Sequence, residues 1–202
     1  MPASRRNAVE LKEDQGQKMN ISRNPRLRMI ALLVAVLMHP ADGFALDLGL
    51  TPSHVFSLWT NINESLIVVG GVVSDDKAWR ESLTASKARK FEGQQPRDVL
   101  EMVASYRTKL DKLLGRQGLE PVKRFNPKEK ETEAITPTVV YLNSGYVLNA
   151  QVTWLIVNTG PEQTVSRFYT RYNFSGKTPS DVLGLVELAN RRLDKILAKA
   201  GL

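Results

Sequence analysis

The sequence contains no cysteine, and this absence excludes several features at once. The chain can form no disulfide, it offers no thiolate to a metal, and it lacks the cysteine that carries a lipoprotein anchor. Histidine is almost as scarce, with two among the 202 residues. A site built from His and Cys therefore has little to draw on, and we predict no metal site and no cofactor.

Long hydrophobic runs are missing as well. The longest, Met29 to Met38, is too short to span a bilayer, which takes about 20 residues. A polar, basic segment precedes it and Gly43-Phe44-Ala45 follows, the order of a secretory signal with small residues where the peptidase cuts. We predict a signal region at 1–45 with an apolar core at 29–38, cleavage after Ala45, and a single domain at 46–202. The alternative is that the apolar run forms a buried N-terminal helix.

Charge is modest once this region is removed. The whole chain carries +7, and residues 1–45 hold seven Lys/Arg and four Asp/Glu, which leaves +4 for residues 46–202. A mildly basic domain is not typical of a nucleic-acid-binding protein. We therefore predict a periplasmic or secreted protein that binds no nucleic acid and has no transmembrane segment after signal removal.

The last stretch, Thr178 to Leu202, is typical of a helix with defined ends. Thr178 suits the N-cap and Pro179 the first helical position, and Asp181 can reach back to the cap amide. The apolar residues follow one helix face at Val182, Val186, Ala189, Leu193 and Ile196. Gly201 is suited to the left-handed conformation that ends a helix.

Three earlier stretches repeat this pattern. The helix-opening prolines are Pro52, Pro96, Pro137 and Pro179, separated by 44, 41 and 42 residues (96 − 52, 137 − 96 and 179 − 137). A valine follows each proline after three residues, at Val55, Val99, Val140 and Val182. A period near 42 indicates a repeat. The first and third copies share Asn-rich middles and β-branched ends, which favours two helix pairs duplicated once.

Four amphipathic helices must bury their apolar faces together, so we predict an all-α fold, a four-helix bundle. The connectors are about 20 residues long, where bundles usually use 2–8. They must cross the bundle, hold short elements or serve a function. We expect a further helix at Trp79–Phe91, a β-like strand at Thr164–Phe174, and either helix or a short strand at Leu66–Val69. The second connector, Glu120 to Ile135, should be extended and mobile.

The helix starts Thr51-Pro52, Thr136-Pro137-Thr138-Val139-Val140-Tyr141 and Thr178-Pro179 carry a family resemblance. Over residues 50–202 the chain resembles a group of uncharacterised exported bacterial proteins with repeated Thr-Pro-x-x-Val-aromatic helix starts. The second copy departs from the pattern, with Gln95 at the Thr position. The resemblance implies the repeat layout and brings no activity, cofactor or site.

Few side chains outside the connectors point to chemistry. His54 lies in the first turn of its helix, where we expect a solvent-facing residue, and no second His or Cys accompanies it in residues 46–202. Asp98 and Asp181 occupy capping positions, which explains both carboxylates. No catalytic set can be assembled, so we predict that the protein is not an enzyme.

Basic-aromatic clusters recur in the connectors and form the candidate binding surface. They are Arg89, Lys90 and Phe91; Lys123, Arg124 and Phe125; and Arg167, Phe168, Tyr169, Arg171 and Tyr172. One interpretation is a shared surface for an anionic or amphipathic partner. The other is that each aromatic residue packs on the bundle while its cation stays in solvent or pairs with a helix carboxylate.

These observations favour an exported, non-catalytic binding or protein-interaction module. Its expected partner is a protein or an anionic envelope component. A structural, envelope-associated protein is the alternative, and an enzyme without a recognisable site is a further one.

Overall fold

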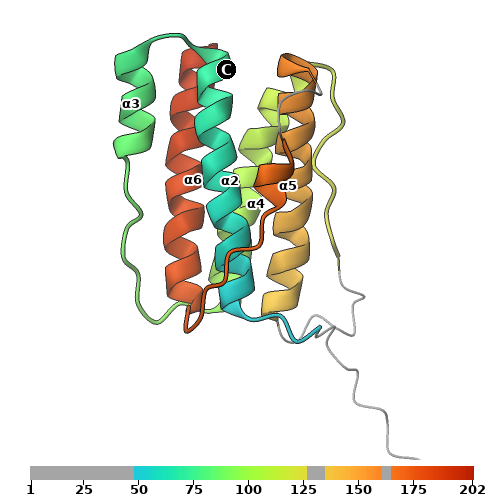
Figure 1. Cartoon of the computed structure of the whole chain (residues 1–202). Coiled ribbons are helices and arrows are strands. Elements are labelled where there is room, and N and C mark those ends of the chain that lie inside the picture. The colour runs from blue at the N-terminus through green and yellow to red at the C-terminus, as the bar shows by residue number, and fades with distance from the viewer. Residues whose placement is uncertain (1–47, 127–134, 161–164) are drawn as a thin grey trace, which may run out of the picture. The chain divides into compact units, whose positions relative to one another are not determined.

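Proline opens each of the four long helices in the computed structural model, which describes residues 48–126, 135–160 and 165–202 (Figure 1). These helices are α2 (Pro52–Val73), α4 (Pro96–Gly115), α5 (Pro137–Thr159) and α6 (Pro179–Ala200). Two short elements lie between them, α3 (Lys77–Ala85) and the 3₁₀ helix η2 (Val165–Tyr169). The expected signal region at 1–45 falls outside the described residues, as do residues 127–134 of the second connector. The described part of that connector, 120–126, forms neither helix nor strand.

The predicted helix caps are present. The backbone N–H of Thr178 donates to Asp181 Oδ2 at 2.8 Å, and that of Gln95 donates to Asp98 Oδ2 at 2.7 Å. The hydrogen bond from the Thr178 backbone, with a further one from its hydroxyl, lowers the pKa of Asp181. Gly201 ends α6 in the left-handed region, at φ 72°. His54 fills the equivalent place in α2, where its Nδ1 lies 3.0 Å from the Thr51 backbone nitrogen.

All four long helices point in the same direction. At one end of the bundle, their first turns surround a single small hollow lined by Pro52, Val55, Pro96, Val99, Pro137, Val140, Pro179 and Val182. Their last turns meet at the opposite end, where Val73, Leu113, Trp154 and Ala200 line a hollow of about 320 Å³. The bundle is therefore parallel, whereas most bundles alternate the direction of successive helices.

The four helices form a ring in which α2 and α4 lie on one diagonal and α5 and α6 on the other. Each member of one pair packs against both members of the other pair. The core between them is apolar, and Trp59, Leu110, Leu193 and Ile196 are fully buried. The predicted all-α four-helix bundle is thus confirmed.

A chain of buried polar groups crosses this core. The hydroxyl of Tyr106 donates to Gln151 Oε1, and the Gln151 amide nitrogen donates to Ser65 Oγ and to the carbonyl oxygen of Ile62. Trp59 Nε1 donates to Ser144 Oγ at 2.9 Å. Because an unsatisfied buried polar group is costly, these bonds hold α2, α4 and α5 at one relative height.

Parallel packing places like helix ends together, which opposes association because the four helix dipoles align. The chain carries charges of the favourable sign at both ends. Asp98 and Asp181 lie in first turns, where the dipole is positive, and Lys112 and Lys199 lie in last turns, where it is negative. These charges offset part of the electrostatic cost.

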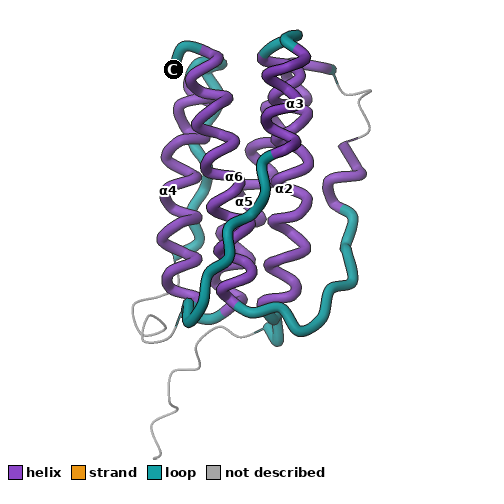
Figure 2. The backbone as a smooth tube through the Cα atoms, turned by 90° about the vertical axis from the view of Figure 1, so that its left-hand side faces the viewer, coloured by secondary structure: helices purple, strands orange, loops and turns teal. Residues whose placement is uncertain are grey.

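The parallel direction forces the chain to return along the bundle three times. The first return segment (residues 74–95) packs α3 against α2 and α6, and the loop below α3 then crosses the outer face of α6 towards the start of α4 (Figure 2). The described part of the second (116–126) follows the α4–α5 groove, and the third (165–178) follows the α2–α5 groove. Side chains of the helices hold each one: Ser180 Oγ accepts from the Gln94 backbone, Asp111 Oδ1 from Val122, and Ser53 Oγ from Lys177.

Two predictions for the return segments need correction. The strand expected at Thr164–Phe174 is wrong, because Val165–Tyr169 is a 3₁₀ helix and the following backbone bonds to side chains of α2 instead of a neighbouring strand. The helix expected at Trp79–Phe91 exists but spans Lys77–Ala85. Beyond it, arginines of α6 bind the carbonyl oxygens of Ser86 and Lys87. Residues Leu66–Val69, for which helix and a short strand were both open, are part of helix α2.

Gly184 is where the first return segment lies closest to α6, and it provides a test of this packing. A Cβ added there would lie 2.5 Å from the carbonyl oxygen of Arg89, a backbone atom that cannot move alone. Gly184→Ala should therefore destabilise the fold by about 1–3 kcal/mol in chemical denaturation. Gly145→Ala, inside α5 with nothing within 4 Å, is the control and should stabilise by up to about 1 kcal/mol. A gain for both variants would contradict the packing described.

Candidate functional site

The three basic-aromatic clusters lie over three different grooves and do not join into one face. Arg89–Phe91 lies beside α6 and Lys123–Phe125 between α4 and α5. Arg167–Tyr172 lies against α2 and α5. Each cluster therefore has its own surroundings.

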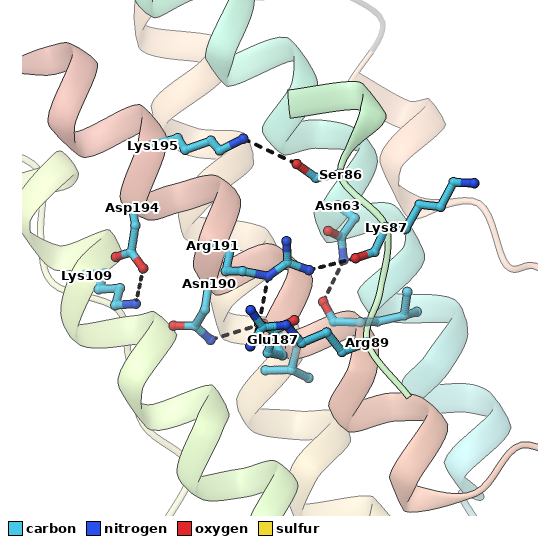
Figure 3. A network of polar contacts seen from close by, with 12 residues as sticks. Asn63, Ser86, Lys87, Arg89, Lys109, Glu187, Asn190, Arg191, Asp194 and Lys195 are labelled. Carbon is cyan, nitrogen blue, oxygen red and sulfur yellow. Dashed lines mark hydrogen bonds and ion pairs between the residues drawn. The ribbon is translucent and has the colours of Figure 1, made fainter. Parts of the chain in front are cut away.

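The first cluster is occupied by contacts within the protein (Figure 3). Arg89 Nη1 lies 3.3 Å from Glu187 Oε1, and the same oxygen accepts from Arg191 Nε at 2.7 Å. Phe91 packs half-buried against the core, and Lys90 is exposed. Beneath this segment, Arg192 is buried and donates to the carbonyl oxygens of Leu83 and Ser86 and to Asn63 Oδ1. Arg89 is therefore paired with a helix carboxylate, as the second interpretation of the clusters requires.

The third cluster is partly engaged. Phe168 is buried, and the Arg167 guanidinium lies 4.7 Å from the centre of its ring. Arg171 Nη2 lies 2.6 Å from His54 Nε2, so the histidine expected to face solvent contacts this cluster. The Tyr172 hydroxyl donates to the carboxylate of Glu64, and this hydrogen bond raises the pKa of Tyr172. Tyr169 is half exposed, and its partial burial raises the pKa of its hydroxyl.

The second cluster leaves its cations free. Asn143 of α5 grips the backbone of Phe125 twice: its Oδ1 accepts from the Phe125 N–H at 3.2 Å and its Nδ2 donates to the Phe125 carbonyl at 3.1 Å. This grip holds the segment across the groove. Lys123 and Arg124 are exposed, and neither makes a hydrogen bond or ion pair to any described residue.

Cavities lie under the second and third return segments. The cavity between α4 and α5 has a volume of about 240 Å³, and Arg107, Arg124 and Phe125 are among its lining residues. The cavity between α2 and α5 has a volume of about 170 Å³, and His54, Tyr169 and Arg171 are among its lining residues. Residues of the second and third clusters thus border hollows that could hold small molecules.

Arg107 is the residue that the sequence analysis missed. Its side chain lines the α4–α5 cavity, it is 8% exposed, and no hydrogen bond or ion pair joins it to the described residues. Burial lowers the pKa of its guanidinium, and the charge of Arg124 lowers it further, while Asp111 acts in the opposite direction. Counted from the helix-opening proline, Arg107 takes the position of Asn63, Leu148 and Asn190 in the other helices. The other three helices have an uncharged residue at this position, and this difference is the signal by which the sequence could have identified Arg107.

The described residues offer neither a metal site nor a clear membrane-spanning helix. No group of three or more His, Cys, Asp or Glu side chains that could hold a metal ion occurs among them. Pro52–Val73 is long and apolar enough to cross a membrane by length and composition, but much of it is buried inside the bundle. Its apolar character is explained by the core.

Comparisons with known proteins assign the chain to no group. No protein-family model matches it, no curated protein is similar to it, and no solved structure matches its fold.

The Asn143 grip is testable. Asn143→Ala removes both bonds to Phe125 and leaves a backbone amide without its partner, so the free energy of unfolding should fall by about 1–3 kcal/mol. The Phe125 amide should also exchange with solvent much faster, measured by NMR hydrogen exchange. Asn149→Ala, at an exposed position of the same helix, is the control and should change neither quantity. Unchanged exchange at Phe125 in Asn143→Ala would show that another contact holds the segment.

Proposed function

We propose that the protein is an exported, non-catalytic binding protein that holds small ligands in the cavities beside α5. The observation that carries this proposal is the contrast between the grooves. Beside the first return segment, Arg192 of α6 and Arg89 of the segment itself are bound to protein acceptors. The second and third segments are held in place by side chains of the helices and yet leave cavities of about 240 and 170 Å³.

The geometry of the segments supports binding in these cavities. A connector that served only to join two helices would gain stability by packing against them, as the first one does. The second segment packs Val122 into the core, and Asn143 binds the Phe125 backbone beside the cavity that remains. A pre-formed cavity with a few polar groups is typical of a small-molecule site. The other candidates, a protein-interaction module and a structural envelope protein, offer no comparable reason for the cavities.

Filling the α4–α5 cavity tests the proposal. In a thermal-shift screen of small anions and neutral metabolites, we expect at least one compound to stabilise the protein. At about 100 times its Kd a ligand contributes about 2.7 kcal/mol, which raises the Tm by roughly 5–10 °C. Ala104→Phe, at a residue lining the cavity, should abolish the shift for ligands of that site. Ala198→Phe, at an exposed position of α6, should leave it unchanged. A screen with no stabilising compound would contradict the proposed function.

Export is the second part of the proposal, and the order of basic segment, apolar run and small residues supports it. We expect the protein recovered from a periplasmic fraction to begin at Leu46, since cleavage after Ala45 removes the preceding residues. Intact-mass measurement checks the cleavage position. Recovery of a full-length species confined to the cytoplasm would rule it out.

A further inference from the structure

We infer that the α4–α5 cavity binds a small carboxylate with an apolar body, and that Arg107 and Arg124 hold its carboxylate group. This inference rests on the proposed function and names the ligand class for one of its two cavities.

The first step is the state of Arg107. Arg107 is largely buried, and the partial loss of hydration lowers the pKa of its guanidinium. A cation in this environment is stabilised when it gains an acceptor. Arg192, also 8% exposed, has the acceptors that Arg107 lacks. It donates to the carbonyl oxygens of Leu83 and Ser86 and to Asn63 Oδ1. Arg107 has no acceptor among the described residues. The cavity beside it is therefore the place from which an acceptor can come.

The second step is the charge. Arg124 lies near enough to Arg107 to lower its pKa, and Asp111 near enough to raise it. No ion pair links Asp111 to Arg107, and one oxygen of this carboxylate already accepts from the Val122 backbone. Two guanidiniums and one carboxylate leave one net positive charge at this edge of the cavity. That charge matches a monoanion, and the planar fork of arginine matches a carboxylate.

The third step is the rest of the cavity wall. Four apolar side chains also line it: Leu100 and Val103 of α4, Val139 of α5, and Ile135. Its volume of about 240 Å³ is several times the share of one water molecule in the liquid, about 30 Å³. Apolar walls of this extent stabilise a hydrocarbon body but not a bare ion such as acetate.

The other cavities fit this ligand less well. At the α2–α5 cavity Arg171 is already in contact with His54. At the end of the bundle Arg116 donates to the Ala200 carbonyl and Lys199 to Asp76. Among the described residues that line these cavities, Arg107 is thus the buried cation that a carboxylate would satisfy.

Octanoate is the probe for the test, measured by isothermal titration calorimetry on the purified protein. Affinity should rise about fourfold for each methylene added from butanoate through octanoate. Arg107→Met, which keeps the length of the side chain and removes its charge, should weaken octanoate binding by about ten- to a hundredfold. Arg97→Met, at an exposed arginine of the same helix, should leave it unchanged. Arg124 is exposed, so Arg124→Gln should leave the core and the fold intact. This variant should weaken octanoate binding to a smaller extent than Arg107→Met.

The controls separate this inference from the broader proposal. If 1-octanol binds as tightly as octanoate, or if Arg107→Met and Arg97→Met behave alike, the assigned ligand class is wrong. If octanoate does not bind but a compound from the thermal-shift screen does and Ala104→Phe abolishes its binding, the binding function stands and the carboxylate inference falls. Thermal unfolding of Arg107→Met checks its fold, which should persist because the variant removes a buried charge.

Discussion

The common direction of the four long helices is the constraint on which the rest of the structure depends. Because every helix starts at the same end, the chain must travel the length of the bundle before each new helix begins. The long connectors follow directly from this requirement. Each return segment lies against these helices, and helix side chains such as Ser53, Asn143 and Ser180 bind its backbone. The cavities exist because two of these segments do not fill the grooves they follow.

Two buried arginines on different helices, Arg107 of α4 and Arg192 of α6, have different surroundings. Arg192 of α6 faces the first return segment, whose carbonyl oxygens of Leu83 and Ser86 satisfy it. It therefore fixes that segment to the bundle. Arg107 of α4 lines the cavity beside the second segment and has no acceptor among the described residues. The same chemical group stabilises the fold in one groove and is left available in the other.

The ends of the helices could be predicted because local chemistry determines them. Thr178, Pro179 and Asp181 form a cap, and Gly201 a stop, whatever the rest of the chain does. The direction and the order of the helices could not, because an apolar face such as that of Val186, Ala189 and Leu193 fits a parallel or an antiparallel neighbour equally well. The placement of the three clusters depends on that order. This is why Phe91, Phe125 and Phe168 looked comparable in the sequence but lie over separate grooves.

The site was harder to predict than the fold. Arg124 and Phe125 were identified by their recurrence in the connectors, but the cavity beneath them also needs Asn143 and Arg107 from two different helices. An arginine in the middle of an amphipathic helix usually extends to solvent, so its burial is a property of the packed bundle. Only the position it shares with Asn63, Leu148 and Asn190 marked it as unusual.

The diagonal arrangement also governs when the protein can become stable. Two pairs of consecutive long helices, α2 with α4 and α5 with α6, lie on diagonals instead of packing side by side. The ring closes when α6 contacts both α2 and α4, and α6 is the last helix to be synthesised. Contacts between distant parts of a chain form slowly, since a long loop must close before they contribute. An emerging chain therefore lacks the contacts that close this ring until residues 179–200 are made.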